Sequence, residues 1–247
     1  MAASTKRPGA SGRQGGAALL MLMLLLVMGV GAASLLLSAL SHLDLEQRRT
    51  QLTLSRLAQA RDALVGYAAT NGRLPRPAIS ALDGHESPQP CTSEQQCTGF
   101  LPWVTLGVAG SDAWGKLLRY SVTPVFTSAP VQRISAIATK TVQTRYASGQ
   151  LAYTAGQDSC TLGAQCAPLV VLSHGKNNFG TSTLGIAQVN TALGNADELL
   201  NAIGSANFVA RPASDDSNAA GGQFDDLVST VSLAYLYKQM AAAHRLP

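Results

Sequence analysis

The stretch that decides the fold is residues 17–40, AALLMLMLLLVMGVGAASLLLSAL, which contains no charged residue and no histidine. At 1.5 Å per residue a helix of this length reaches about 36 Å, which exceeds the roughly 30 Å hydrocarbon core of a bilayer. Lys6, Arg7 and Arg13 precede it without any acidic residue. Because cationic flanks stay in the cytoplasm, we expect a single-pass transmembrane helix with its N-terminus inside.

The helical pattern continues beyond this apolar run. Apolar residues recur mostly at spacings of three and four up to Tyr67, and no proline interrupts them. The first stop signal is Asn71-Gly72, which prolines soon follow. The sequence therefore predicts one long helix over residues 17–71, transmembrane to about residue 40, and a head domain over residues 72–247.

The head has the composition of an α+β domain. Runs rich in β-branched and aromatic residues are bounded by Gly, Pro, Asn and Asp, which predicts strands. These runs are Leu101–Leu106, Leu117–Phe126, Arg133–Tyr146, Leu151–Ala155, Pro168–Ser173, Phe208–Arg211 and Phe224–Ser232. A helical turn is expected near Glu198–Ile203, and a short C-terminal helix from Leu233 with Ser232 as its N-cap. We expect an α+β fold with a mainly antiparallel sheet.

The charge balance argues against a nucleic-acid partner. The chain has 18 Lys and Arg and 14 Asp and Glu, giving a formal net charge of +4. Three of the basic residues lie before the apolar run, which leaves 15 basic against 14 acidic residues for the rest. The basic pI of about 9.0 therefore reflects the leader and does not indicate nucleic-acid binding.

The residues do not predict an enzyme. No G-x-S-x-G, H-E-x-x-H or Walker pattern occurs. Ser173 and His174 are adjacent on a predicted strand, so their side chains point to opposite faces and do not form a nucleophile–base pair.

The four cysteines form two C-x5-C pairs, Cys91 with Cys97 and Cys160 with Cys166. Such pairs oxidise readily outside the cytoplasm. Four cysteines allow three connectivities, of which the two local disulfides are the simplest, and cross-pairing or free thiols are the alternatives. A zinc site is not expected, because the spacing is not C-x2-4-C.

The junction Arg13-Gln14-Gly15-Gly16-Ala17-Ala18-Leu19-Leu20 resembles the processing site of type IV pilins and type II secretion pseudopilins. In that family a prepilin peptidase cuts a short basic leader after a glycine and methylates the new N-terminus. The resemblance implies a leader over residues 1–16, cleavage after Gly16 and N-methylation of Ala17, with a cut one residue earlier as the near alternative. Outside this family, the same segment would be an uncleaved signal anchor or a secretory signal peptide cut at Gly31-Ala32-Ala33.

Several head segments also resemble pseudopilin heads. Asp112–Tyr120, with Trp114-Gly115 at its centre, resembles the D-P-W-G-x-P-x-x-Y signature, and Ser173–Gly180 is similar to the S-x-G-x-[DN]-G loop after a central strand. Further similar segments are Arg61–Ala68 with Gly72–Pro75, Leu101–Gly107 and Phe224–Val228. Arg76 stands where close relatives often have a cysteine.

The resemblance implies a minor pilin-like structural subunit of a type II secretion or type IV pilus filament, held in the bacterial inner membrane with a periplasmic head. Its partners would be other pilin or pseudopilin subunits, bound through the N-terminal helix, and the prepilin peptidase. The family usually has Glu at mature position five, which pairs with a neighbour's N-terminal amine, whereas this chain has Met21. That difference favours a place at the filament tip. The alternative is a signal-anchored periplasmic binding protein unrelated to filaments.

The resemblance requires no cofactor. A weaker hypothesis concerns calcium, because the major pseudopilin uses a C-terminal loop of oxygen ligands. Asp225 and Asp226 are the candidate ligands here, facing the Asn177-Asn178 turn. We favour a solvated pair of acids at the end of a strand over a calcium site.

Overall fold

The computed structural model describes the backbone of residues 15–247 and the side chains of residues 19–30 and 43–247. The chain divides into two compact units, Met1–Arg48 and Arg49–Pro247. Helix α1 (Gly15–Asn71) begins in the first unit and ends in the second. It ends at the predicted residue, because Gly72 adopts a left-handed φ of 71° and its N–H donates to the carbonyl of Ala68 (2.9 Å).

The expected membrane span over residues 17–40 is wrong. A helix needs about 20 consecutive apolar residues to cross a bilayer, and in the part of the chain that the structure describes no helix is both long enough and apolar enough. The expected inner-membrane location, with a cytoplasmic N-terminus and a periplasmic head, rested on that span and falls with it. Of the expected leader, residues 1–14 lie outside the described residues, and Gly16 and Ala17 lie in the first turn of α1.

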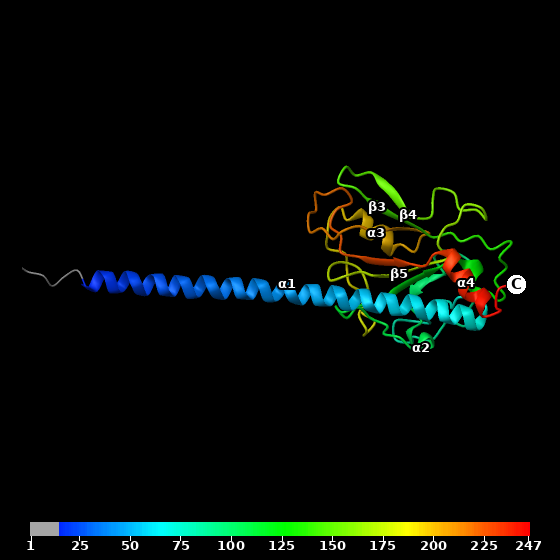
Figure 1. Ribbon diagram of the computed structural model, residues 1–247, viewed down its shortest axis with the longest axis horizontal. Coiled ribbons are helices and arrows are strands. Elements are labelled where there is room, and N and C mark those ends of the chain that lie inside the picture. Colours follow the sequence, from blue (N-terminus) through cyan, green and yellow to red (C-terminus); the bar gives the residue numbers. More distant parts are fainter. Residues whose placement is uncertain (1–14) are drawn as a thin grey trace, which may run out of the picture. The chain divides into compact units, whose positions relative to one another are not determined.

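The second unit contains two β-sheets (Figure 1). The four-stranded sheet is antiparallel throughout, with the order β1 (Thr98–Phe100), β2 (Arg119–Val122), β5 (Leu169–Ser173), β7 (Leu227–Thr230). The three-stranded sheet has the order β4 (Leu151–Ala155), β3 (Thr141–Arg145), β6 (Asn207–Val209), in which β3 is antiparallel to β4 and parallel to β6. The observed architecture is therefore α+β with mainly antiparallel sheets.

Strand β5 separates two hydrophobic cores. Leu169 and Val171 belong to the larger core and Val170 and Leu172 to the smaller one, because successive side chains of a strand point to opposite faces. The larger core includes residues of α1 and of helix α4 (Leu233–Ala242), namely Leu57, Ala60, Leu64, Ala68, Leu233, Leu236 and Met240. The smaller core includes Val142 of β3 and Phe208 of β6. Helices thus cover one face of the four-stranded sheet, and the second sheet covers the other.

The predicted strands differ from the observed ones at their ends. The strand expected over Leu101–Leu106 is wrong: Trp103–Leu106 is the short helix α2, which Pro102 precedes and which ends at Gly107 with a left-handed φ of 66°. The strand expected to reach Phe126 ends at Val122, because Pro124 begins the 3-10 helix η1 (Pro124–Thr127). The strand expected from Arg133 begins at Thr141.

The predicted helices and disulfides are confirmed. The turn near Glu198 is helix α3 (Ala196–Ala202), and α4 begins after Ser232, whose hydroxyl accepts a hydrogen bond from the N–H of Tyr235 (3.3 Å). The structure contains both local disulfides, Cys91–Cys97 and Cys160–Cys166. Each bond closes a short loop and so restricts the unfolded chain.

Glu86 ties the end of α1 to the loop that follows it. Its carboxylate accepts hydrogen bonds from the hydroxyl of Tyr67 (2.7 Å) and the N–H of Arg76 (2.9 Å), and it pairs with the guanidinium groups of Arg73 and Arg76. Burial raises the pKa of Glu86, but these donors together outweigh burial and hold its pKa below the ordinary value. An ion pair therefore stands at Arg76, where the resemblance would place a cysteine.

We predict that Glu86→Gln lowers the free energy of unfolding by about 2–3 kcal/mol near neutral pH, because two guanidinium groups in a largely buried site lose their counter-charge. A carboxyl whose pKa is lowered by folding contributes stability above its unfolded pKa, and this contribution is lost as the pH falls through the folded-state value. The two proteins should therefore converge in acid. Denaturant titrations near neutral pH and near pH 3 measure this.

The matched control is Asp83→Asn in the same loop. The half-exposed side chain of Asp83 contacts the exposed His85, and asparagine can keep the hydrogen bond from the His85 N–H. It should leave the unfolding midpoint unchanged. A Glu86→Gln protein as stable as the wild type at neutral pH would contradict the role given to Glu86.

Candidate functional site

The loop His174–Gly180 follows the buried strand β5 and has an unusual backbone. Gly175, Asn178, Phe179 and Gly180 have positive φ values of 56°, 21°, 46° and 79°. A Cβ atom on Gly175 would lie 2.5 Å from the carbonyl oxygen of Asp225, so this position requires glycine. The loop therefore turns tightly against the segment that leads into β7.

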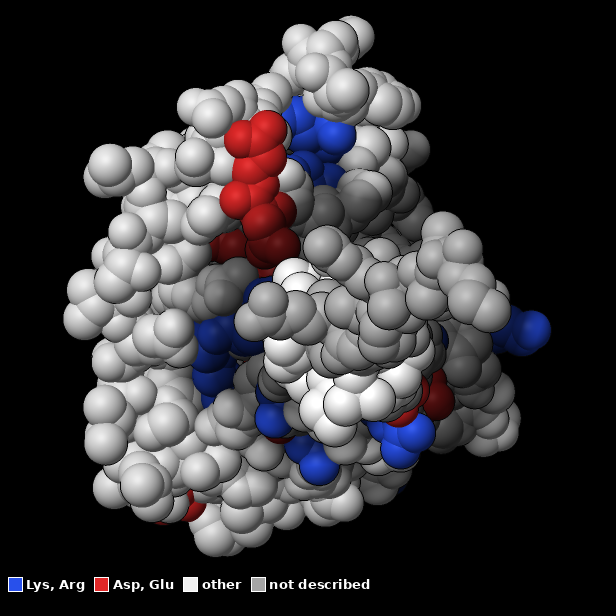
Figure 2. Space-filling view, turned by 90° about the vertical axis from the view of Figure 1, so that its left-hand side faces the viewer, with Lys and Arg blue, Asp and Glu red and all other residues white. Residues whose placement is uncertain are grey.

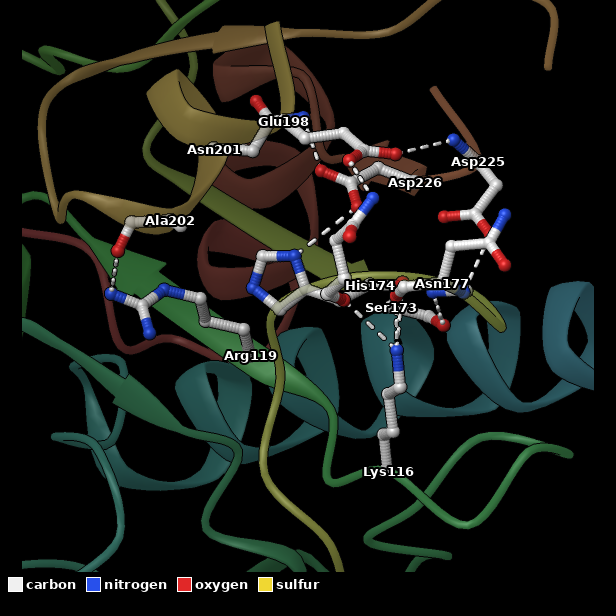
Figure 3. Close-up of polar contacts among 12 residues, drawn as sticks. Lys116, Arg119, Ser173, His174, Asn177, Glu198, Asn201, Ala202, Asp225 and Asp226 are labelled. Atoms are coloured by element: carbon white, nitrogen blue, oxygen red, sulfur yellow. Dashed lines mark hydrogen bonds and ion pairs between the residues drawn. The ribbon is translucent and has the colours of Figure 1, made fainter. Parts of the chain in front are cut away.

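The ammonium group of Lys116 lies inside this loop (Figure 3). It donates to the carbonyl oxygens of His174 (3.3 Å) and Asn178 (3.0 Å), and also to that of Asn177. Lys116 is buried, and burial lowers its pKa, which the nearby charges of Asp225 and Asp112 oppose. Three carbonyl groups of the loop thus obtain their donor from one lysine.

Three carboxylates lie beside the loop, on Glu198 of α3 and on Asp225 and Asp226 before β7 (Figure 3). Their oxygen atoms approach within 4.8 Å of one another. Glu198 accepts from the N–H of Asp225 (2.9 Å) and from the side-chain amides of Asn178 (3.2 Å) and Asn195 (2.8 Å). This carboxylate therefore links α3, the loop and the start of β7.

Asp225 and Asp226 bind different groups. Oδ2 of Asp225 accepts from the N–H of Asn177 (2.8 Å), whereas its buried Oδ1 has no hydrogen-bond partner. Asp226 contacts Nδ1 of His174 (3.1 Å) and accepts from the amide of Asn201 (2.7 Å). Burial is the main cause that raises the pKa of Asp225 from 3.8 to about 6, and the neighbouring carboxylates add to it.

Ser173 and His174 face different partners, as the sequence predicts for adjacent strand residues. The hydroxyl of Ser173 donates to Oδ2 of Asp112 (2.6 Å) and accepts from the N–H of Gly175 (3.0 Å). The imidazole of His174 instead contacts Asp226. The two side chains therefore hold separate parts of the loop.

The structure places one of the two calcium candidates as expected, but the expected solvated pair of acids is wrong, because Asp226 and Oδ1 of Asp225 are buried. Asp225 faces the turn at Asn177, whereas Asp226 faces His174 and Asn201. Glu198 completes the carboxylate group, and the sequence gives no sign of it, because α3 and β7 meet only in the folded chain. Lys116 was also missed as a partner, although it lies inside the segment that contains Trp114. Because an ammonium group already takes the loop carbonyls, the arrangement is that of an internal clamp with its own cation.

A cleft of about 430 Å³ opens next to this cluster. Its lining is polar and consists of Lys176, Asn177, Asn178, Gln188, Thr191, Asp215 and Gln223. Figure 2 shows one face of the molecule, on which uncharged residues predominate and acidic side chains form a short strip with basic side chains nearby. Opposite charges are thus interspersed there, and no field of a single sign forms.

No protein-family model matches this chain, and neither the curated proteins nor the solved structures contain a significant match.

We predict that Asp225→Asn stabilises the second unit by about 1–3 kcal/mol above pH 7. Folding raises the pKa of this carboxyl, so the ionised carboxylate destabilises the folded state. This destabilisation is complete above pH 6 and disappears as the pH falls to the unfolded-state value of 3.8. Asparagine keeps an oxygen for the N–H of Asn177 without that destabilisation. The difference between variant and wild type should therefore vanish near pH 4. Equilibrium unfolding at both pH values measures it.

Asp215→Asn, in an exposed loop, is the control and should change neither value. A variant that is less stable than the wild type above pH 7, and a wild type that calcium stabilises, would together favour the calcium hypothesis over the internal clamp.

Proposed function

We propose that this chain is a minor pilin-like structural subunit of a type II secretion or type IV pilus filament. The observation that carries the proposal is the contact among three segments that each resemble pseudopilin heads. Asp112 and Lys116 come from the segment around Trp114, and they bind the loop that begins at Ser173. Asp225, from the third segment, binds the same loop at Asn177. These segments are far apart in the sequence and form one structural unit.

Helix α1 supports assembly through apolar contacts. Every large apolar side chain from Leu19 to Val30 is 59–73% exposed in the isolated chain. Exposed apolar surface of this kind marks a place where another molecule binds. Helices of neighbouring subunits would cover it in a filament. The partners we propose are therefore other pilin-like subunits that bind α1, together with the prepilin peptidase.

The charged groups of the second unit support a structural role. The loop carbonyls, Lys116 and the carboxylates bind one another, and these bonds hold the loop against α3 and the start of β7. Asp197 likewise pairs with Arg145 and Arg211. These interactions hold loops in place, as a subunit in a filament requires.

The first test is the mature N-terminus. In cells that contain a prepilin peptidase, the processed chain should begin at Ala17 with a methylated amine. Gly16→Leu should leave the full-length precursor, because the peptidase requires a glycine before the cut in proteins that this junction resembles. Mass spectrometry of the intact protein distinguishes these forms.

The matched control is Ala33→Leu, which blocks a conventional signal-peptide cut and should leave processing at Ala17 unchanged. An intact Met1, or a mature chain that begins at Ser34, would contradict the pilin-like proposal.

The second test concerns position in the filament. Between the leader and Asp44 the chain has no acidic residue, so it cannot offer a buried carboxylate to a neighbour's amine. We therefore expect far fewer copies of this subunit than of the main subunit in purified filaments, and a place near the tip. Met21→Glu should increase its incorporation, whereas Met23→Glu, with the same charge at another position, should not. Quantitative mass spectrometry measures the copy ratio, and equal abundance would rule out the tip position.

A further inference from the structure

Strand β4 forms the outer edge of the three-stranded sheet (Figure 1). It pairs with β3 through Arg145↔Leu151, Thr144↔Ala152 and Gln143↔Tyr153. Beyond Tyr153 the register shifts by a bulge. Over these residues, one edge of β4 pairs with β3, and the opposite edge pairs with no strand in the described part of this chain.

The backbone groups on the outer side can be identified from the hydrogen-bond pattern. The N–H of Tyr146 donates to the carbonyl of Gln150 (2.9 Å), which makes these two residues a hydrogen-bonded pair. Such pairs alternate along an antiparallel ladder, so Ala152 also bonds to β3, whereas Leu151 and Tyr153 direct their N–H and C=O groups away from it. Over the described residues these outward groups bond to no other part of the chain.

Two other sheet edges, those of β6 and β1, are closed by the chain itself. On β6, Asn201 binds both the N–H and the C=O of Val209, at 2.8 and 2.9 Å, and Ser205 does the same for Asn207, at 3.1 and 2.8 Å. On β1, the carbonyl of Phe100 accepts from the N–H of Ala78 (2.9 Å). Side chains and loops thus satisfy these edges, and β4 lacks such a cover.

The side chains of β4 do not oppose pairing with another strand. Its sequence, LAYTA, contains no charged residue and no proline, which are two of the devices that protect an edge strand. Tyr153 is 38% exposed. Leu151 and Tyr153 lie on one face of the strand, so they are placed to form an aliphatic–aromatic pair with a second strand.

We propose that β4 pairs with β4 of a second copy of this chain. In an antiparallel pair centred on Ala152, Leu151 faces the partner's Tyr153 and Tyr153 faces the partner's Leu151. Each of these pairs joins outward N–H and C=O groups, as a hydrogen-bonded pair requires. The two Ala152 residues then form the close, non-hydrogen-bonded pair on the two-fold axis, where a small side chain fits. The edge is self-complementary, and the three-stranded sheets become one continuous sheet.

The contact is small. Interfaces below about 1,000 Å² are usually transient, so we expect weak pairing of free chains and stronger pairing where heads are held close together. The contact uses no part of α1, and it therefore does not depend on the filament proposal.

A cysteine on the two-fold axis tests the register. All four natural cysteines are in disulfides, so an added thiol is free. In the full-length chain, Ala152→Cys places two Cα atoms about 4.5 Å apart, which suits a disulfide. We expect mild oxidation to give roughly tenfold more covalent dimer from this variant than from Gln150→Cys. In the proposed register the two Gln150 residues are about 14 Å apart along the strands, which is too far for a disulfide.

A second substitution tests the backbone contact. Tyr153→Pro removes an outward N–H, together with the phenol ring that would face the partner's Leu151 and its hydrogen bond to Asp158 (2.8 Å). No bond between β4 and β3 uses that N–H, so the fold should remain, as circular dichroism can check. Added to Ala152→Cys, it should abolish the dimer. Equal cross-linking of the Ala152→Cys and Gln150→Cys proteins would overturn the proposed register. Dimer formation that survives Tyr153→Pro in a folded protein would overturn the strand pairing itself.

Discussion

Strand β5, with the sequence LVVLS, is buried on both faces, and every one of its residues is shielded from water. Two layers must therefore cover it: α1 and α4 on one side, and the second sheet on the other. The strand ends at Ser173 inside the protein, so the loop that follows begins among buried residues. Buried carbonyl groups need donors, and Lys116 supplies one for three carbonyl groups of this loop.

A buried ammonium group is itself unfavourable without negative charge nearby. Asp112, Glu198, Asp225 and Asp226 supply that charge, and their own remaining oxygens bind backbone and amide N–H groups. The burial of β5 therefore explains the cluster step by step. The loop carbonyls after the strand need a donor, the lysine is that donor, and the carboxylates balance the charge of the lysine. Oδ1 of Asp225 is the one buried carboxylate oxygen without a partner among those described, and the raised pKa of that residue is consistent with this.

Local signals in the sequence predicted what local interactions decide. The end of α1 at Asn71-Gly72, the bounds of β4, the Ser232 cap and both short disulfides depend on neighbouring residues, and all were predicted. The helix α2 was missed because Trp-Val-Thr-Leu has the composition of a strand, while Pro102 and Gly107 decide its structure. Glu198 was missed as a partner of Asp225 because only the tertiary fold joins them. The membrane span was expected from apolar composition alone, and the described helices do not contain one.

The two surfaces that we propose for association differ in kind from the ion pairs inside the second unit. Several buried charges of the second unit are paired within it: Lys140 with Glu94, Arg211 with Asp197, and Glu86 with two arginines. The apolar surface of α1 and the backbone edge of β4, the two surfaces proposed for association, are both uncharged. Contacts between uncharged groups are little affected by the screening that weakens surface ion pairs. Association through either surface should therefore persist at high ionic strength, where assembly driven by charged patches would fail.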